Sequence, residues 1–94
     1  MDRFFEWDPV KARQNAIRHG VNFKVATDVF FDLNAIWFED ILHSTAAEGR
    51  ELVIGLSRKG VLIVGFTERP PITRLITARF ADREERKLYE DQKD

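Results

Sequence analysis

The stretch that decides the fold runs from Glu51 to Phe80 and reads ELVIGLSRKGVLIVGFTERPPITRLITARF. Apolar residues dominate two segments, 51–57 and 61–67, and Arg58-Lys59-Gly60 between them supplies a glycine for a tight turn. Glu68-Arg69-Pro70-Pro71 cannot continue a central strand, because proline cannot donate to the ladder. Residues 72–80 then resume the strand pattern. The stretch therefore predicts a β-hairpin followed by a third strand.

A short strand and a helix are predicted at the start of the chain. Residues 4–7 (FFEW) are typical of a strand, and Asp8 followed by Pro9 is typical of a helix start, because aspartate caps a helix and proline at the first position loses no hydrogen bond. Gly20 is expected to end this helix in the left-handed conformation. The residues expected on its inner side, by helical spacing, are Ala12, Ala16 and Ile17.

A second helix and a second strand are predicted before the hairpin. Asn22 is the expected cap of this helix, and residues 32–34 (DLN) are expected to break it. Its predicted buried residues are Phe23, Ala26, Val29 and Phe30. Ala35 to Leu42 (AIWFEDIL) suits a strand that contains Trp37, and residues 43–49 are expected to form a loop.

The chain is predicted to end in a helix. Asp82 and Glu85 have the spacing of a capping box, and Leu88 and Tyr89 are expected to form the inner edge of this helix. The order of elements predicts an α+β fold over residues 1–94 as one domain. We expect a small antiparallel sheet with two N-terminal helices and one C-terminal helix.

Composition and charge narrow the possible functions. The chain is 44% hydrophobic, so it has material for a core, and its net charge of −1 hides an asymmetry. Residues 1–49 carry a net charge of −3, whereas residues 50–87 carry +4, which permits a local positive patch. The absence of cysteine, of a signal-peptide pattern and of a long apolar run leads us to expect a cytoplasmic protein without a membrane anchor.

Most catalytic motifs are absent. The sequence has no cysteine nucleophile, no Gly-x-Ser-x-Gly motif and no phosphate-binding glycine-rich loop. Glu39, Asp40 and His43 are possible metal ligands, but in a strand Asp40 and His43 point to opposite faces, and no second histidine is near in sequence. We therefore expect no metal and no cofactor.

The arginines of the last strand allow two interpretations. Arg74 lies among apolar residues, so it is expected to form an ion pair, with Glu68 or Glu48 as the candidate partner. Alternatively, Arg79 at the strand end joins Arg83 to form an anion site beside a helix N-terminus. Strict alternation places Arg74 and Arg79 on opposite faces of the sheet, unless a bulge or the strand end reorients one of them.

Three segments in one register resemble the BrnT family of toxins, from about Phe4 to Tyr89. The opening segment contains Phe5-Glu6-Trp7-Asp8-Pro9, Lys11-Ala12, Asn15 and His19-Gly20-Val21. The middle segment contains Glu48, Arg50, Ile54-Gly55 and Val64 to Glu68. The closing segment contains Arg74 to Arg79, Ala81, Glu85-Arg86 and Tyr89. Phe80 departs from the family pattern, in which a basic residue is frequent at this position.

The resemblance implies a RelE-like fold and a ribonuclease that halts translation. It also implies a BrnA-like antitoxin that holds the toxin inactive in a hetero-oligomer, and binding of operator DNA only through that antitoxin. Metal-free RNA cleavage needs a base for the ribose 2′-hydroxyl and cations for the extra phosphorane charge. His19 or Glu48 is the candidate base, and the candidate phosphate ligands are Arg50, Arg74 and Arg79. Further candidate contacts with RNA are Lys11, Arg18, Arg69 and Arg83.

Two other functions remain open at this point. One is a regulatory module of the same fold that binds RNA or protein without turnover, which the net charge of −1 and Phe80 favour. The other is an inactivated toxin that retains its contact with the antitoxin.

Overall fold

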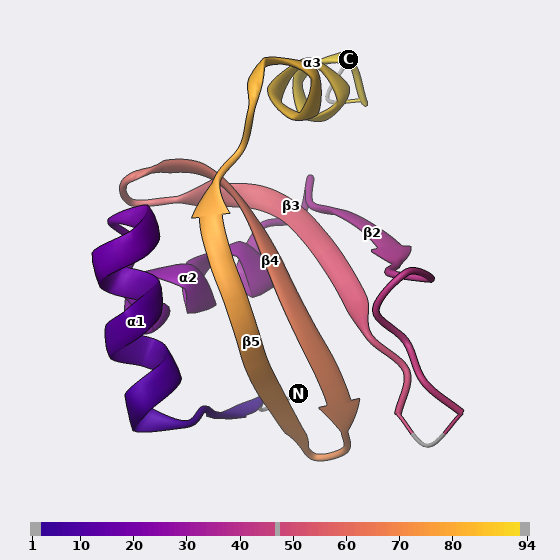
Figure 1. Ribbon diagram of the computed structural model, residues 1–94. Coiled ribbons are helices and arrows are strands. Elements are labelled where there is room, and N and C mark those ends of the chain that lie inside the picture. Colours follow the sequence, from indigo (N-terminus) through magenta and orange to yellow (C-terminus); the bar gives the residue numbers. More distant parts are fainter. Residues whose placement is uncertain (1–2, 47, 93–94) are drawn as a thin grey trace.

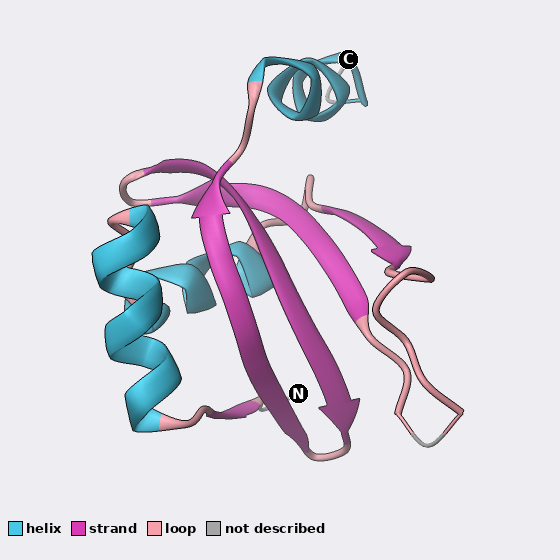
Figure 2. Ribbon diagram, viewed as in Figure 1, coloured by secondary structure: helices cyan, strands magenta, loops and turns pink. Residues whose placement is uncertain are grey.

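The computed structural model describes residues 3–46 and 48–92, and its five strands form one mixed sheet in the order β1-β5-β4-β3-β2 (Figure 1). The elements in chain order are β1 (Phe4–Glu6), α1 (Pro9–His19), α2 (Phe23–Ala26), the 3₁₀ helix η1 (Thr27–Phe31), β2 (Ile36–Glu39), β3 (Glu51–Ser57), β4 (Gly60–Arg69), β5 (Ile72–Phe80) and α3 (Arg83–Gln92). The fold is α+β, as predicted, and Figure 2 shows how its helices and strands are distributed.

The hairpin and the third strand of the opening stretch are confirmed. The bounds of β3 and β5 are the predicted ones, and the turn glycine, Gly60, has a φ of +127°. β4 is longer than the predicted strand over 61–67: it begins at Gly60 and continues through Glu68 and Arg69. Both prolines lie in the turn beyond Arg69, so they end the strand without removing any of its ladder donors.

The expectation of a small, purely antiparallel sheet is wrong. β1 lies parallel to β5, with Phe4 opposite Ile72 and Glu6 opposite Arg74, and the sheet has five strands. Tight connections imply antiparallel neighbours only for the strands that they join. β1 is separated from β2 by the N-terminal helices, so no turn signal constrained its direction.

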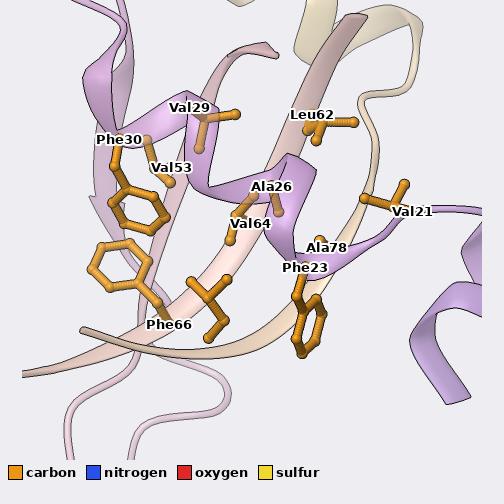
Figure 3. Close-up of a cluster of buried hydrophobic side chains, with 11 residues drawn as sticks. Val21, Phe23, Ala26, Val29, Phe30, Val53, Leu62, Val64, Phe66 and Ala78 are labelled. Carbon is orange, nitrogen blue, oxygen red and sulfur yellow. The ribbon is translucent and has the colours of Figure 1, made fainter. Parts of the chain in front are cut away.

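The main hydrophobic core lies between the sheet and the N-terminal helices. The four predicted residues of α2 and η1 are all buried, and they pack on Val53, Val64 and Phe66 of the sheet (Figure 3). The rings of Phe30 and Phe66 meet edge to face, with centroids 5.0 Å apart. Gly55 permits this close packing, because a Cβ atom there would lie 2.9 Å from Cβ of Val29.

The predicted inner face of α1 is confirmed only at Ala12, which is partly buried against the core. Asp8 caps the helix and Gly20 ends it at a φ of +69°, as expected, but Ala16 is exposed and Ile17 is 87% exposed. The buried residue is Asn15, whose Nδ2 donates to the carbonyls of Ala78 (2.8 Å) and Val21 (3.1 Å). Its Oδ1 accepts from the N–H of Ala78 at 3.1 Å. A polar residue is needed on this face because it satisfies the free edge of β5 beyond β1.

The strand predicted over Ala35 to Leu42 is shorter in the structure. β2 contains Trp37 but ends at Glu39, which pairs with Glu51, the first residue of β3. A strand needs a partner for its ladder, so the chain leaves the sheet where β3 begins. Asp40 to His43 form a turn instead, and Ile41 and Leu42 are 78% and 91% exposed.

α3 begins with the predicted capping box. The N–H of Glu85 donates to Asp82, and the N–H of Asp82 donates to Glu85, each at 2.8 Å. Tyr89 is buried against Ile54 and Ile63 on the face of the sheet opposite the N-terminal helices. Leu88 is 58% exposed, so its predicted place on the inner edge is wrong. None of the helices within residues 3–46 and 48–92 is long and apolar enough to cross a membrane.

Candidate functional site

A bulge in β5 brings its candidate site residues to one face. Gly65 pairs with Thr77 and Phe66 pairs with Leu75, so Ile76 is an extra residue opposite this step of β4. Leu75 and Ala78 therefore both point into the helix-side core, although strict alternation would separate them. Arg74, Thr77 and Arg79 consequently share the other face. A bulge was the condition under which the sequence allowed Arg74 and Arg79 to lie on one face, and β5 has that bulge.

A cleft of about 590 Å³ occupies this open face of the sheet. Its floor is apolar and includes Leu52, Ile54, Ile63 and Ile76. The turn after β2 forms one wall, and the start of α3 forms another. Charged and titratable side chains line it together with the apolar ones: His19, Asp40, His43, Arg50, Arg79 and Glu85. The cleft thus combines an apolar surface with a charged rim.

Arg50 lies where this cleft meets two smaller pockets. One, of about 230 Å³, is also lined by Lys11, Arg18 and His19, and the other, of about 70 Å³, by Lys11, Glu48 and Arg74. Within the described part of the chain, the Arg50 guanidinium has no hydrogen bond and no ion pair. The arginine is only half-exposed. A half-buried arginine without a partner is a ready site for an anion.

Arg79 also lines the cleft, but its charge is paired. Its Nη1 and Nη2 donate to the two carboxylate oxygens of Glu85 at 2.8 and 2.9 Å. This bond to Glu85 is the main cause that raises the pKa of Arg79. The expected cooperation with Arg83 is not seen, because Glu85 occupies the guanidinium and Arg83 lines none of the three pockets.

The ion pair predicted for Arg74 has a different partner from those expected. Arg74 donates to Glu6 at 2.9 Å, so an ion pair is present but the proposed partners Glu68 and Glu48 are wrong. The parallel pairing of β1 explains this, because it places Glu6 opposite Arg74. Glu48 accepts from Arg69 at 2.6 Å. Arg69 lines none of the three pockets, and Glu48 lines only the smallest of them.

Sequence reasoning missed the relation between Asp40 and His43. It placed the two residues on opposite faces of a strand, but β2 ends before them and the turn brings Nδ1 of His43 within 2.8 Å of Oδ2 of Asp40. The Asp-x-x-His spacing in a turn was the available signal. Across the residues that the structure describes, no three histidine or acidic side chains converge as metal ligands.

The α+β domain thus has an open sheet face with an apolar floor and a rim of arginine and histidine side chains. Such a surface suits a ligand that carries both anionic phosphates and flat aromatic rings, as single-stranded nucleic acid does. The chain belongs to the family described as ribonuclease toxin, BrnT, of type II toxin–antitoxin system, whose sequence model matches residues 7–85. A toxin of this class has an antitoxin as its partner. No curated protein matches the chain. The resemblance seen in the sequence is confirmed.

Proposed function

We propose that this chain is a metal-independent endoribonuclease that binds single-stranded RNA in the open-face cleft. One observation carries the proposal: the half-buried Arg50 guanidinium is unpaired among the described residues, and it lies at the junction of three pockets. The family membership supplies the class of substrate, and the cleft offers a place for the phosphate beside a place for a base.

The parts of the cleft suit different parts of the RNA. Phe38 of β2 lines the cleft and is 40% exposed, so a nucleobase can stack on its ring above the apolar floor. Arg50 is placed to bind the scissile phosphate. Lys11 and Arg18 extend the positive surface along α1 for the adjoining backbone.

The proposed reaction needs no metal. The ribose 2′-oxygen attacks the adjacent phosphorus, the bond to the 5′ oxygen breaks, and the products carry a 2′,3′-cyclic phosphate and a 5′-hydroxyl. Arg50 stabilises the phosphorane charge, which develops only in the transition state. Arg79 contributes through the donors that Glu85 leaves free. Of the two bases considered from sequence, His19 lines the main cleft and Glu48 does not.

Membership of the family supports a proposal for the finer biological role. We propose that the chain has a RelE-like fold, cleaves RNA needed for translation in the cytoplasm, and is neutralised by a BrnA-like antitoxin in a hetero-oligomer. Operator DNA is then contacted only through the antitoxin. Exposed apolar side chains at the cleft, Leu42 and Leu88, support a covering protein, because such groups are stabilised by burial.

Expression of the chain in a bacterial host tests this role. Induction should arrest growth and the incorporation of labelled amino acids, and Arg50→Ala should abolish both effects. Arg13→Ala is the matched control, because it removes the same charge from an exposed position of α1 that lines none of the pockets. Normal growth with abundant folded wild-type chain would count against the proposal.

The Arg79–Glu85 pair favours a second candidate, a module that binds RNA without cleaving it. A carboxylate that occupies an arginine in the cleft lowers its positive potential. This candidate predicts retention of RNA on a filter with the RNA recovered intact, whereas the ribonuclease predicts shortened products.

A further inference from the structure

The turn after β2 contains a histidine whose ring is oriented by a carboxylate. Nδ1 of His43 lies 2.8 and 3.0 Å from the two oxygens of Asp40. The Asp40 side chain is 16% exposed and that of His43 is 64% exposed. The carboxylate is therefore largely protected from water, while the ring remains within reach of a ligand in the cleft that both residues line.

The contact determines which ring nitrogen is free for chemistry. An ionised carboxylate can only accept a hydrogen bond, so Nδ1 of His43 carries the proton. In the neutral ring, Nε2 is then the lone-pair nitrogen. This is the tautomer that a general base requires, and the same carboxylate stabilises the positive ring that forms when the base takes a proton.

The backbone ties this turn to Arg50. The N–H of Asp40 donates to the carbonyl of Arg50 at 2.9 Å, and the N–H of Arg50 donates to Oγ of Ser44 at 2.8 Å. Ser44 Oγ in turn donates to the carbonyl of Asp40 at 2.8 Å. Residues on both sides of His43 are therefore bonded to the backbone of the arginine proposed to bind phosphate.

We propose that His43 is the general base of the ribonuclease and that Asp40 positions it, an inference that rests on the proposed function. Nε2 of His43 takes the proton from the ribose 2′-hydroxyl as the 2′-oxygen forms its bond to phosphorus. The 5′ oxygen leaves with the electron pair of the broken bond and takes a proton from water. The His43 ring then returns its proton to the solvent, so the step balances without a cofactor.

A cleavage assay with purified variants tests the assignment. The substrate is a single-stranded RNA oligonucleotide in a buffer containing EDTA, and His43→Ala should cleave it about 10²-fold or more slowly, the usual loss for a general base. RNA binding should be retained because Arg50 is unchanged, and added imidazole should restore part of the rate. Ile41→Ala is the control from the same turn, since Ile41 is 78% exposed and does not line the cleft.

Asp40 needs a readout that separates positioning from folding. Asp40→Asn should lower kcat while leaving KM close to the wild-type value, and Asp40→Glu should recover part of kcat. The bonds to Arg50 use the backbone of Asp40, so they survive both substitutions. If Asp40→Asn instead raises KM and lowers the melting temperature, Asp40 has a structural role and its part of the proposal is overturned.

The outcomes separate this inference from the proposed function. Cleavage by the wild type in EDTA together with full cleavage by His43→Ala would overturn only the assignment of the base. A slow His43→Ala that imidazole does not accelerate, with a melting temperature below that of the wild type, would also overturn it. Cleavage by the wild type only after a divalent metal is restored would refute the metal-free function and the base with it.

Discussion

Replacement of Asn15 by alanine should destabilise the fold more than any exposed substitution in α1. Asn15 is 7% exposed, and its side chain makes three hydrogen bonds, two with Ala78 and one with the carbonyl of Val21. At about 1 kcal/mol for each bond, the variant should lose roughly 3 kcal/mol of unfolding free energy. Small domains have only about 5–15 kcal/mol in total, so the loss is large.

Urea denaturation followed by circular dichroism measures this change. The midpoint should fall for Asn15→Ala with little change in slope, because the surface exposed on unfolding is nearly the same. Gln14→Ala, at the neighbouring exposed position, is the control and should stay within about 0.5 kcal/mol of the wild type. An Asn15→Ala variant as stable as Gln14→Ala would refute the view that Asn15 satisfies the edge of β5.

Two further predictions concern packing and pH. Gly55→Ala should cost about 1–3 kcal/mol of stability, because the added Cβ would lie 3.1 Å from the carbonyl oxygen of Val29. The control is Gly49→Ala, whose added Cβ meets nothing within 4 Å and which should be close to neutral. Thermal melts of both variants measure the difference. Burial, and then the bond to Asp32, raises the pKa of Tyr89 from 10.0 to about 12. Stability present below pH 10 should therefore fall as the pH rises through 12, and Tyr89→Phe should lack that fall in parallel urea titrations.

The strand bounds were predictable where turn signals in the sequence mark the same ends as the pairing with a neighbouring strand. β3 and β5 have the predicted bounds because a glycine turn and a proline pair delimit them, and each has a full-length neighbour. The segment from Ala35 to Leu42 is just as apolar, yet only residues 36–39 form a strand. The length of β2 is set by where its partner β3 begins. That pairing depends on the tertiary structure and cannot be deduced from an apolar run alone.

The candidate site was predictable in its residue types and less so in its pairings. Arg50, Arg79 and His19, three of the candidates named from the sequence, line one cleft, and their roles stay a prediction. The ion pair of Arg74 with Glu6 joins residues 68 positions apart through the parallel β1, which no turn signal revealed. The capping box, by contrast, had already placed Glu85 near the start of α3, so its contact with Arg79 was within reach of sequence reasoning.

Cleavage of RNA by Arg50→Ala is the most direct test of the central claim that the open-face cleft is a metal-free ribonuclease site. Purified wild-type chain and the Arg50→Ala and Arg13→Ala variants are incubated with an end-labelled single-stranded RNA in EDTA, and the product ends are identified. We predict 2′,3′-cyclic phosphate ends, a rate for Arg50→Ala lower by roughly 10²–10³-fold, and a wild-type rate for Arg13→Ala. Equal rates for the wild type and Arg50→Ala, with both chains folded, would contradict the claim.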